Sequence, residues 1–202
     1  EMFERDNEKE IQNYLNDSIN KKAFDTLVRF WPNYATDYAP LLEYCKADSI
    51  PFHATNIPRR FANNVYKNDF SALDSLSNEE KTWVAPMPIT FYDTLPQYQA
   101  ILEMMGAHGS VNLVKAQAMK DATMAYFILE ILKSSDQVLH YNGTFHSNFH
   151  EGIYWYLKHY RPETSIQTIA TVEQEDIEHL SEEHFGKADF IIVVDSDFPT
   201  SY

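Results

Sequence analysis

The sequence has little cysteine and little positive charge, and it lacks long apolar runs. Its one cysteine, Cys45, excludes an internal disulfide and a cysteine metal cluster, and its apolar surroundings favour a packing role on a helix face over a reactive thiol. Lysine and arginine number 16 against 30 acidic side chains, which gives a formal net charge of −14. Because that charge repels polyphosphates and anionic lipid, we expect neither nucleic acid nor an anionic membrane surface as a partner.

The absence of any stretch of about 18 apolar residues indicates that no segment crosses a bilayer. The first five residues, Glu1 to Arg5, are not typical of a signal peptide. The chain has 202 residues, of which 44% are hydrophobic and 14% aromatic. These values predict one packed domain over residues 1–202 with a substantial core.

Strand-like and helix-like patterns alternate along the chain. Apolar residues at helical spacing predict several helices, the strongest of them over residues 111–133, and apolar runs predict strands at 50–57, 138–141, 165–172 and 187–195. We predict an α/β fold in three layers, with a mainly parallel central sheet flanked by helices.

The segment from residue 84 to 110 is broken by prolines and rich in methionine and aromatic residues. Such a partly helical, partly irregular insertion is typical of a lid over an apolar ligand. The alternative is a well-packed surface excursion without that role.

The chain between Gln137 and Gly152 contains the main candidate for a functional site. It predicts a short strand, a turn at Asn142 and Gly143, and the polar start of a helix. Ligands of open α/β sheets bind just beyond the carboxyl ends of the strands, where His146 would lie. A strand-to-helix connection without a function remains the alternative.

Gln117 and Asp121 are the polar residues that stand out on the helix predicted at 111–133. They are four residues apart and therefore share one face, while apolar residues cover nearly the whole circumference. An unpaired buried carboxylate is costly. Asp121 is thus expected either to pair with a neighbouring element or to face a polar cavity.

Two adjacent arginines, Arg59 and Arg60, follow Pro58 at the start of another predicted helix. The amide groups and the dipole of a helix N-terminus favour an anion, and arginine binds carboxylates and phosphates well. The pair therefore indicates an anionic ligand. A structural ion pair with Asp121 or Glu1 is equally compatible with the sequence.

The histidines allow several roles. A neutral His146 could ligate a metal or haem iron, act as a general base, or bond to a tyrosine that is the iron ligand. His150 follows it by four residues, the spacing of zinc ligands on a helix. His108 could reach a ligand from the lid, whereas His53 and His140 are interpreted as locally bonded residues.

Several segments, in this order and spacing, resemble the ChaN-like family of haem-binding uptake proteins. That family shares a superfamily with the Tiki metalloproteases and, more remotely, the erythromycin esterases. The resemblance covers essentially the whole chain, which looks like the domain without its first strands. It rests on Glu1-Met-Phe-Glu4, Phe30-Trp-Pro-Asn-Tyr34, Ala54-Thr-Asn-Ile-Pro-Arg-Arg60, Leu102-Glu-Met-Met-Gly-Ala-His-Gly109, Ala116-Gln-Ala-Met-Lys-Asp-Ala-Thr-Met-Ala125, Tyr141-Asn-Gly-Thr-Phe-His-Ser147 and Lys187-Ala-Asp-Phe-Ile-Ile-Val-Val-Asp195.

The resemblance implies a cleft built from a Gly-Glu-x-His segment, an acidic residue and a Gly-x-x-His segment. Glu1 matches the acidic residue and Gly143-Thr-Phe-His146 matches the last segment, whereas the first has no counterpart in this sequence. It also implies ligation of haem iron by a tyrosine, but none of the 13 tyrosines can be assigned.

We therefore expect a haem- or iron-binding protein of a bacterial cell envelope. It would be attached to the membrane only through a lipid anchor outside this chain, and a homodimer is allowed. The expected cofactor-binding residues are Arg59, Arg60, Gln117, Asp121, His146 and His108, with an arginine on the haem propionates.

The alternative function implied by the superfamily is a metal-dependent hydrolase that acts on an ester or amide. Glu1 and His146 would be its catalytic residues, with Mn or Zn as the cofactor. The expected metal ligands are His146, Glu1 and His150.

Overall fold

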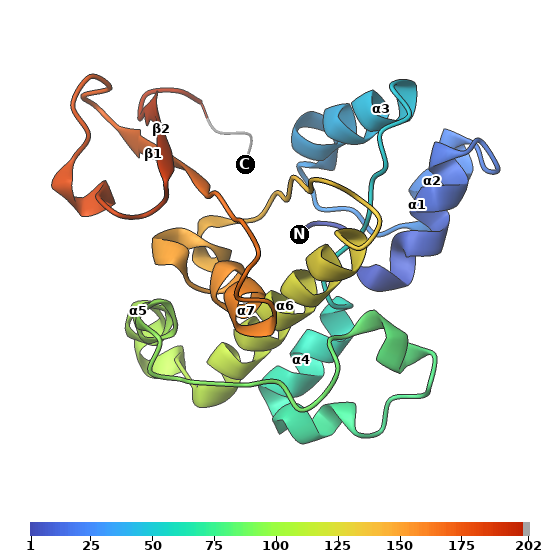
Figure 1. Cartoon of the computed structure of the whole chain (residues 1–202), viewed down its shortest axis with the longest axis horizontal. Coiled ribbons are helices and arrows are strands. Elements are labelled where there is room, and N and C mark those ends of the chain that lie inside the picture. Colours follow the sequence, from blue (N-terminus) through green and yellow to red (C-terminus); the bar gives the residue numbers. More distant parts are fainter. Residues whose placement is uncertain (200–202) are drawn as a thin grey trace.

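The chain is mostly helical in the computed structural model, which describes residues 1–199 (Figure 1). The α/β class predicted from the sequence is confirmed, because helices are joined in the described part by a parallel pair of strands. The elements are α1 (Glu8–Leu15), α2 (Lys21–Leu27), α3 (Ala39–Ala47), α4 (Arg59–Asn68), α5 (Pro96–Met105), α6 (Val111–Ile131), α7 (Ile153–Tyr160), β1 (Ile169–Gln174) and β2 (Phe190–Asp195), with short 3-10 and π turns between them.

The parallel sheet consists of β1 and β2 in the described part of the chain. Its register runs from the pair Ile169 and Phe190 to the pair Gln174 and Asp195. Figure 1 shows the two strands at one end of the molecule, across from α1, α2 and α3. The sheet is therefore smaller and more peripheral than the central sheet that we expected.

The expected strands at 50–57 and 138–141 do not form within residues 1–199, where both segments are irregular. Outside β1 and β2, the one backbone bridge of the described residues is a parallel one between Glu4 and Asn56. The prediction of regular strands at these two places was therefore wrong.

Side chains make several of the bonds between these segments and Glu1. The side-chain amide of Asn56 donates to the carbonyl of Glu1 at 2.9 Å. Thr55 Oγ1 lies 2.8 Å from His140 Nε2. These contacts hold the segments beside one another without a continuous ladder, because side-chain bonds compete with backbone pairing.

The long helix α6 lies at the centre of the larger hydrophobic core. Helices α4, α5 and α7 all pack against it, and Figure 1 shows it running diagonally through the molecule. Most of its side chains from Val114 to Leu129 are buried, as its apolar circumference predicted. The helix begins at Ser110, whose Oγ accepts the N–H of Leu113 at 3.2 Å.

A second core packs α1, α2 and α3 against the first residues of the chain. Phe3 lies at its centre, with its ring centroid between 5.4 and 6.5 Å from those of four other aromatic residues, Phe24, Phe30, Tyr34 and Phe52. Because Phe3 is packed in this way, it also holds Glu1, two residues earlier in the chain, in a defined position.

The segment 84–110 contributes to the larger core. Val84, Tyr98 and Ile101 are buried, whereas Met104 and Met105 are exposed. The inner face of α5 is thus part of the packed body, and a role as a lid stays a prediction. Among the described residues, no helix combines the length and the apolar character that crossing a bilayer requires.

Candidate functional site

The side chains of Glu1 and His146 are in contact, and His146 lies shortly after the segment 138–141. His146 lies in the 3-10 turn Thr144–His146 and is only 5% exposed. Its Nε2 lies 3.2 Å from Oε1 of Glu1, and the backbone N–H of Gly143 donates to Oε2 of Glu1 at 2.6 Å. The two segments that match the family cleft therefore form one contact.

Asp121 binds the other side of the His146 ring. Its side chain is fully buried on α6, and its Oδ1 accepts a short hydrogen bond from Nδ1 of His146. Its Oδ2 accepts the hydroxyl of Tyr98 at 2.9 Å. The amide of Gln117 lies against the ring, with its Nε2 3.1 Å from Nδ1 of His146. The partner expected for the buried carboxylate is thus a histidine on a distant segment.

The surroundings of these groups shift their pKa values strongly. Burial raises the pKa of Glu1, but the hydrogen bond and charge of His146 outweigh it and lower the pKa to about 2. Burial lowers the pKa of His146, but Asp121 and then Glu1 outweigh it and raise the pKa to about 9. Burial raises the pKa of Asp121, and His146 and Tyr98 only partly offset that rise. At neutral pH, His146 is therefore an imidazolium between two carboxyl groups.

Gly152 makes this arrangement sterically possible. Its φ is +55°, and a Cβ added there would lie 2.4 Å from the carbonyl oxygen of His146 and 3.3 Å from Oδ2 of Asp121. A glycine is therefore required at this position. Before the structure, only the position of Gly152 ahead of a predicted helix pointed to a special role for this glycine.

Tyr98 is the residue of this network that sequence reasoning missed. Its position in the segment 84–110 associated it with the lid, but its side chain is fully buried beside Asp121. A buried carboxylate on an enclosed helix does predict a hydrogen-bond donor nearby. The sequence does not say which of the many polar side chains supplies it.

The two arginines are engaged by acidic residues of the N-terminal segment. Arg60 forms a short ion pair with Asp6, and its guanidinium lies 4.4 Å above the ring of Phe61. The backbone N–H of Arg59 donates to Oε2 of Glu4 at 2.9 Å, so a carboxylate of the chain itself lies at the start of α4. The ion-pair partner is thus Asp6 rather than Asp121 or Glu1.

His108 and His150 lie apart from the contacts of His146. His108 is exposed in the 3-10 turn Gly106–His108. Nε2 of His150 lies 3.1 Å from Asp189. The spacing between His146 and His150 is not helical, because Phe149 and His150 have φ values of 59° and 60°. Within residues 1–199, no three His, Cys, Asp or Glu side chains form a group that could hold a metal ion, and the predicted metal role stays a prediction.

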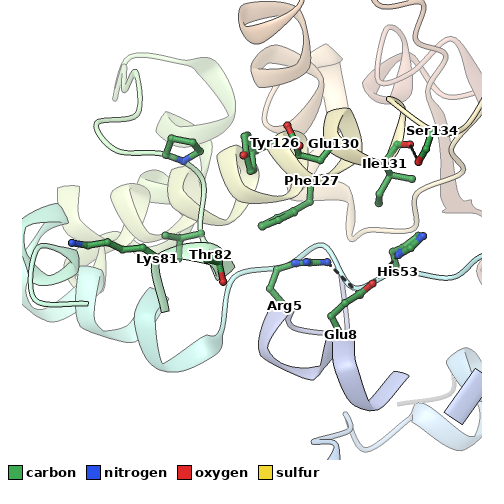
Figure 2. A pocket seen from close by; sticks show the side chains of 12 residues that line it. Arg5, Glu8, His53, Lys81, Thr82, Tyr126, Phe127, Glu130, Ile131 and Ser134 are labelled. Atoms are coloured by element: carbon green, nitrogen blue, oxygen red, sulfur yellow. Dashed lines mark hydrogen bonds and ion pairs between the residues drawn. The ribbon is translucent and has the colours of Figure 1, made fainter. Parts of the chain in front are cut away.

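A cavity of about 590 Å³ lies between the start of α1, the segment 50–57 and the C-terminal part of α6 (Figure 2). The guanidinium of Arg5 lies 4.0 Å above the ring of Phe127 on the facing wall. Glu8 accepts from Nδ1 of His53 at 2.7 Å and lies 3.3 Å from Arg5.

Comparison with known proteins identifies a family but no individual relative. No curated protein and no solved structure matches the chain. The family described as haem-binding uptake, Tiki superfamily, ChaN, matches residues 1–157, which include Glu1, Tyr98, Asp121 and His146. The chain therefore belongs to the ChaN family of haem-binding uptake proteins in the Tiki superfamily.

Proposed function

We propose that the protein binds haem beside the contact between Glu1 and His146. The observation that carries this proposal is a series of exposed apolar side chains next to that contact. Leu139, Tyr141, Phe145 and Phe149 are each between 40% and 70% exposed. Exposed aromatic side chains beside a polar site are typical of a surface that binds a large, flat, apolar ligand.

Two of these side chains flank a buried contact. Leu139 and Tyr141 are exposed, whereas Nε2 of His140 between them lies 2.8 Å from Oγ1 of Thr55. A phenol oxygen can ligate ferric haem iron. Tyr141 fits that role, since its side chain is 53% exposed and it lies five residues before His146 in the sequence.

His146 fits a supporting role better than that of an iron ligand. Both of its ring nitrogens already face carboxylates, so no lone pair is free for a metal in this arrangement. We propose that the imidazolium and its partners form the polar floor of the haem site. Arg59 and Arg60 remain candidates for the propionates, for which Arg60 would have to leave Asp6. His108 remains a candidate for reaching the ligand from the segment 84–110.

A haem titration followed by absorbance tests the proposal. The wild-type protein should give a saturable shift of the Soret band, and Tyr141→Phe should change its position and weaken binding by tenfold or more, in line with loss of a metal ligand. Tyr44→Phe is a matched control, because the side chain of Tyr44 is similarly exposed and its helix, α3, packs in the second core. A wild-type protein without saturable binding would contradict haem binding itself.

We also propose that the protein acts in the cell envelope of a bacterium, in keeping with the uptake role of its family. A lipid anchor outside this chain would attach it to the membrane, and two copies could share a haem surface. Fractionation of cells that express the full-length gene tests the location, and sedimentation with and without haem tests the oligomeric state.

A second candidate function is metal-dependent hydrolysis with Glu1 and His146 as the catalytic residues. His146, an imidazolium in this arrangement, would first have to lose a proton before it could act as a general base. Such an enzyme would need a divalent ion, Mn or Zn, and a carboxylate would have to turn away from the ring before His146 could bind that ion. This candidate predicts hydrolysis of an ester or amide that requires the added ion and is lost in Glu1→Gln. Haem binding without any such hydrolysis would contradict this second candidate and support the binding function.

A further inference from the structure

The hydroxyl of Tyr98 connects α5 to the proposed site. Tyr98 is fully buried, and its hydroxyl donates to Oδ2 of Asp121 at 2.9 Å. Oδ1 of the same carboxylate accepts a hydrogen bond from Nδ1 of His146. We propose that Tyr98 is a positioning residue of the haem site, which holds Asp121 so that Asp121 fixes the ring of His146. This inference rests on the proposed function of that site.

The two oxygens of Asp121 explain why a second donor matters. The terminal torsion of an aspartate is broad, so a carboxylate bonded through one oxygen can still turn about that bond. When Tyr98 and His146 bond to different oxygens, the carboxylate has one orientation that satisfies both. The direction of the His146 ring, and of its Nε2 toward Glu1, then follows from the position of Tyr98.

Packing fixes the position of the Tyr98 hydroxyl. Its ring lies in the larger core, with its centroid 6.2 Å from that of Phe91 in a stacked arrangement. The backbone N–H of the preceding Gln97 donates to the carboxylate of Glu151 at 2.6 Å, just before Gly152. Both contacts tie the start of α5 to the segment that carries His146.

Tyr14 supplies a matched control in the second core. It is 4% exposed, and its hydroxyl donates to the carboxylate of Glu43 at 2.7 Å. Tyr98→Phe and Tyr14→Phe each remove one buried hydroxyl that donates to a carboxylate, and each keeps the ring. A general loss of stability should therefore affect both variants, whereas a positioning effect should appear in Tyr98→Phe alone.

The test combines a direct readout of the His146 ring with haem affinity. In nitrogen-detected NMR of the haem-free protein, the wild type should show a downfield, slowly exchanging Nδ1 proton on His146, assigned with His146→Gln. Tyr98→Phe should accelerate its exchange at least about tenfold and weaken haem binding about tenfold, as loss of a supporting hydrogen bond does at metal sites. Tyr14→Phe should leave both measurements near the wild-type values.

Two results would overturn the inference: an unchanged His146 signal in Tyr98→Phe, or an equal change in Tyr14→Phe. Failure of the proposed function looks different, because the wild-type protein would then show no saturable Soret shift at all. In that case an altered His146 signal in Tyr98→Phe alone would still establish the positioning role.

Discussion

Replacement of Gly152 by alanine tests how closely the chain packs around His146. The methyl group would meet the carbonyl oxygen of His146 at 2.4 Å and its carbonyl carbon at 2.9 Å. Both are backbone atoms, which cannot turn away as the end of a flexible side chain could. The residue also has a φ of +55° and a ψ of −119°, where an alanine is strained.

The two costs can be separated with Gly106. Its φ of +50° and ψ of −124° nearly equal those of Gly152, but a Cβ there meets nothing within 4 Å. Gly106→Ala should therefore cost only backbone strain, about 1–3 kcal/mol. Gly152→Ala should cost that strain plus overpacking of a further 1–3 kcal/mol or so.

Urea unfolding of both variants and the wild type measures this difference in free energy directly, and thermal unfolding measures it a second time. For a chain of this size, 1 kcal/mol changes the melting temperature by about 2–4 °C, so Gly152→Ala should melt roughly 2–12 °C below Gly106→Ala. The His146 ring signal should also move in Gly152→Ala alone. Equal destabilisation by the two substitutions would refute the close approach of Gly152 to His146.

Three further predictions concern charge and hydrogen bonding. The pKa of His146 is raised to about 9, so protonation of His146 stabilises the fold fully below pH 6.5, and this contribution to the free energy of unfolding is lost as the pH rises toward 9. The urea concentration at the unfolding midpoint should therefore fall over that pH interval, and it should fall less in His146→Gln. Thr123→Val removes the buried hydroxyl that accepts the N–H of Ala85 at 3.3 Å, and chemical denaturation should show a loss of about 1–3 kcal/mol, with Thr123→Ser close to the wild type. Arg60→Ala breaks an ion pair with Asp6 whose arginine side chain is 49% exposed, so thermal melting should change by less than about 1 kcal/mol in free energy.

The helices could be predicted from the sequence because their signals are local. Apolar spacing placed the central helix at 111–133, and the structure has α6 at Val111–Ile131. The prediction of strands at 50–57 and 138–141 was wrong, because no regular strand forms there within residues 1–199. Pairing of strands depends on partners that are distant in the sequence, and here the side chains of Thr55 and Asn56 make part of the contacts.

The candidate site shows the same division. Spacing indicated that Gln117 and Asp121 share a face, and the structure has both against His146. The spacing of His146 and His150 predicted a shared face only for a helix. Phe149 and His150 instead have positive φ values, so their segment turns before α7 begins.

The burial of Asp121 explains why part of the site could be predicted and part could not. A carboxylate enclosed by apolar neighbours must have bonded partners, so the sequence predicts that some exist. The identity of these partners depends on which other segments pack against α6. Tyr98, on α5, lies 23 residues before Asp121, and His146 lies 25 residues after it. Neither separation has a period that a sequence pattern could reveal. The enclosed helix therefore provides the fixed point, and the packing of α5 and of the turn before α7 decides which side chains complete the site.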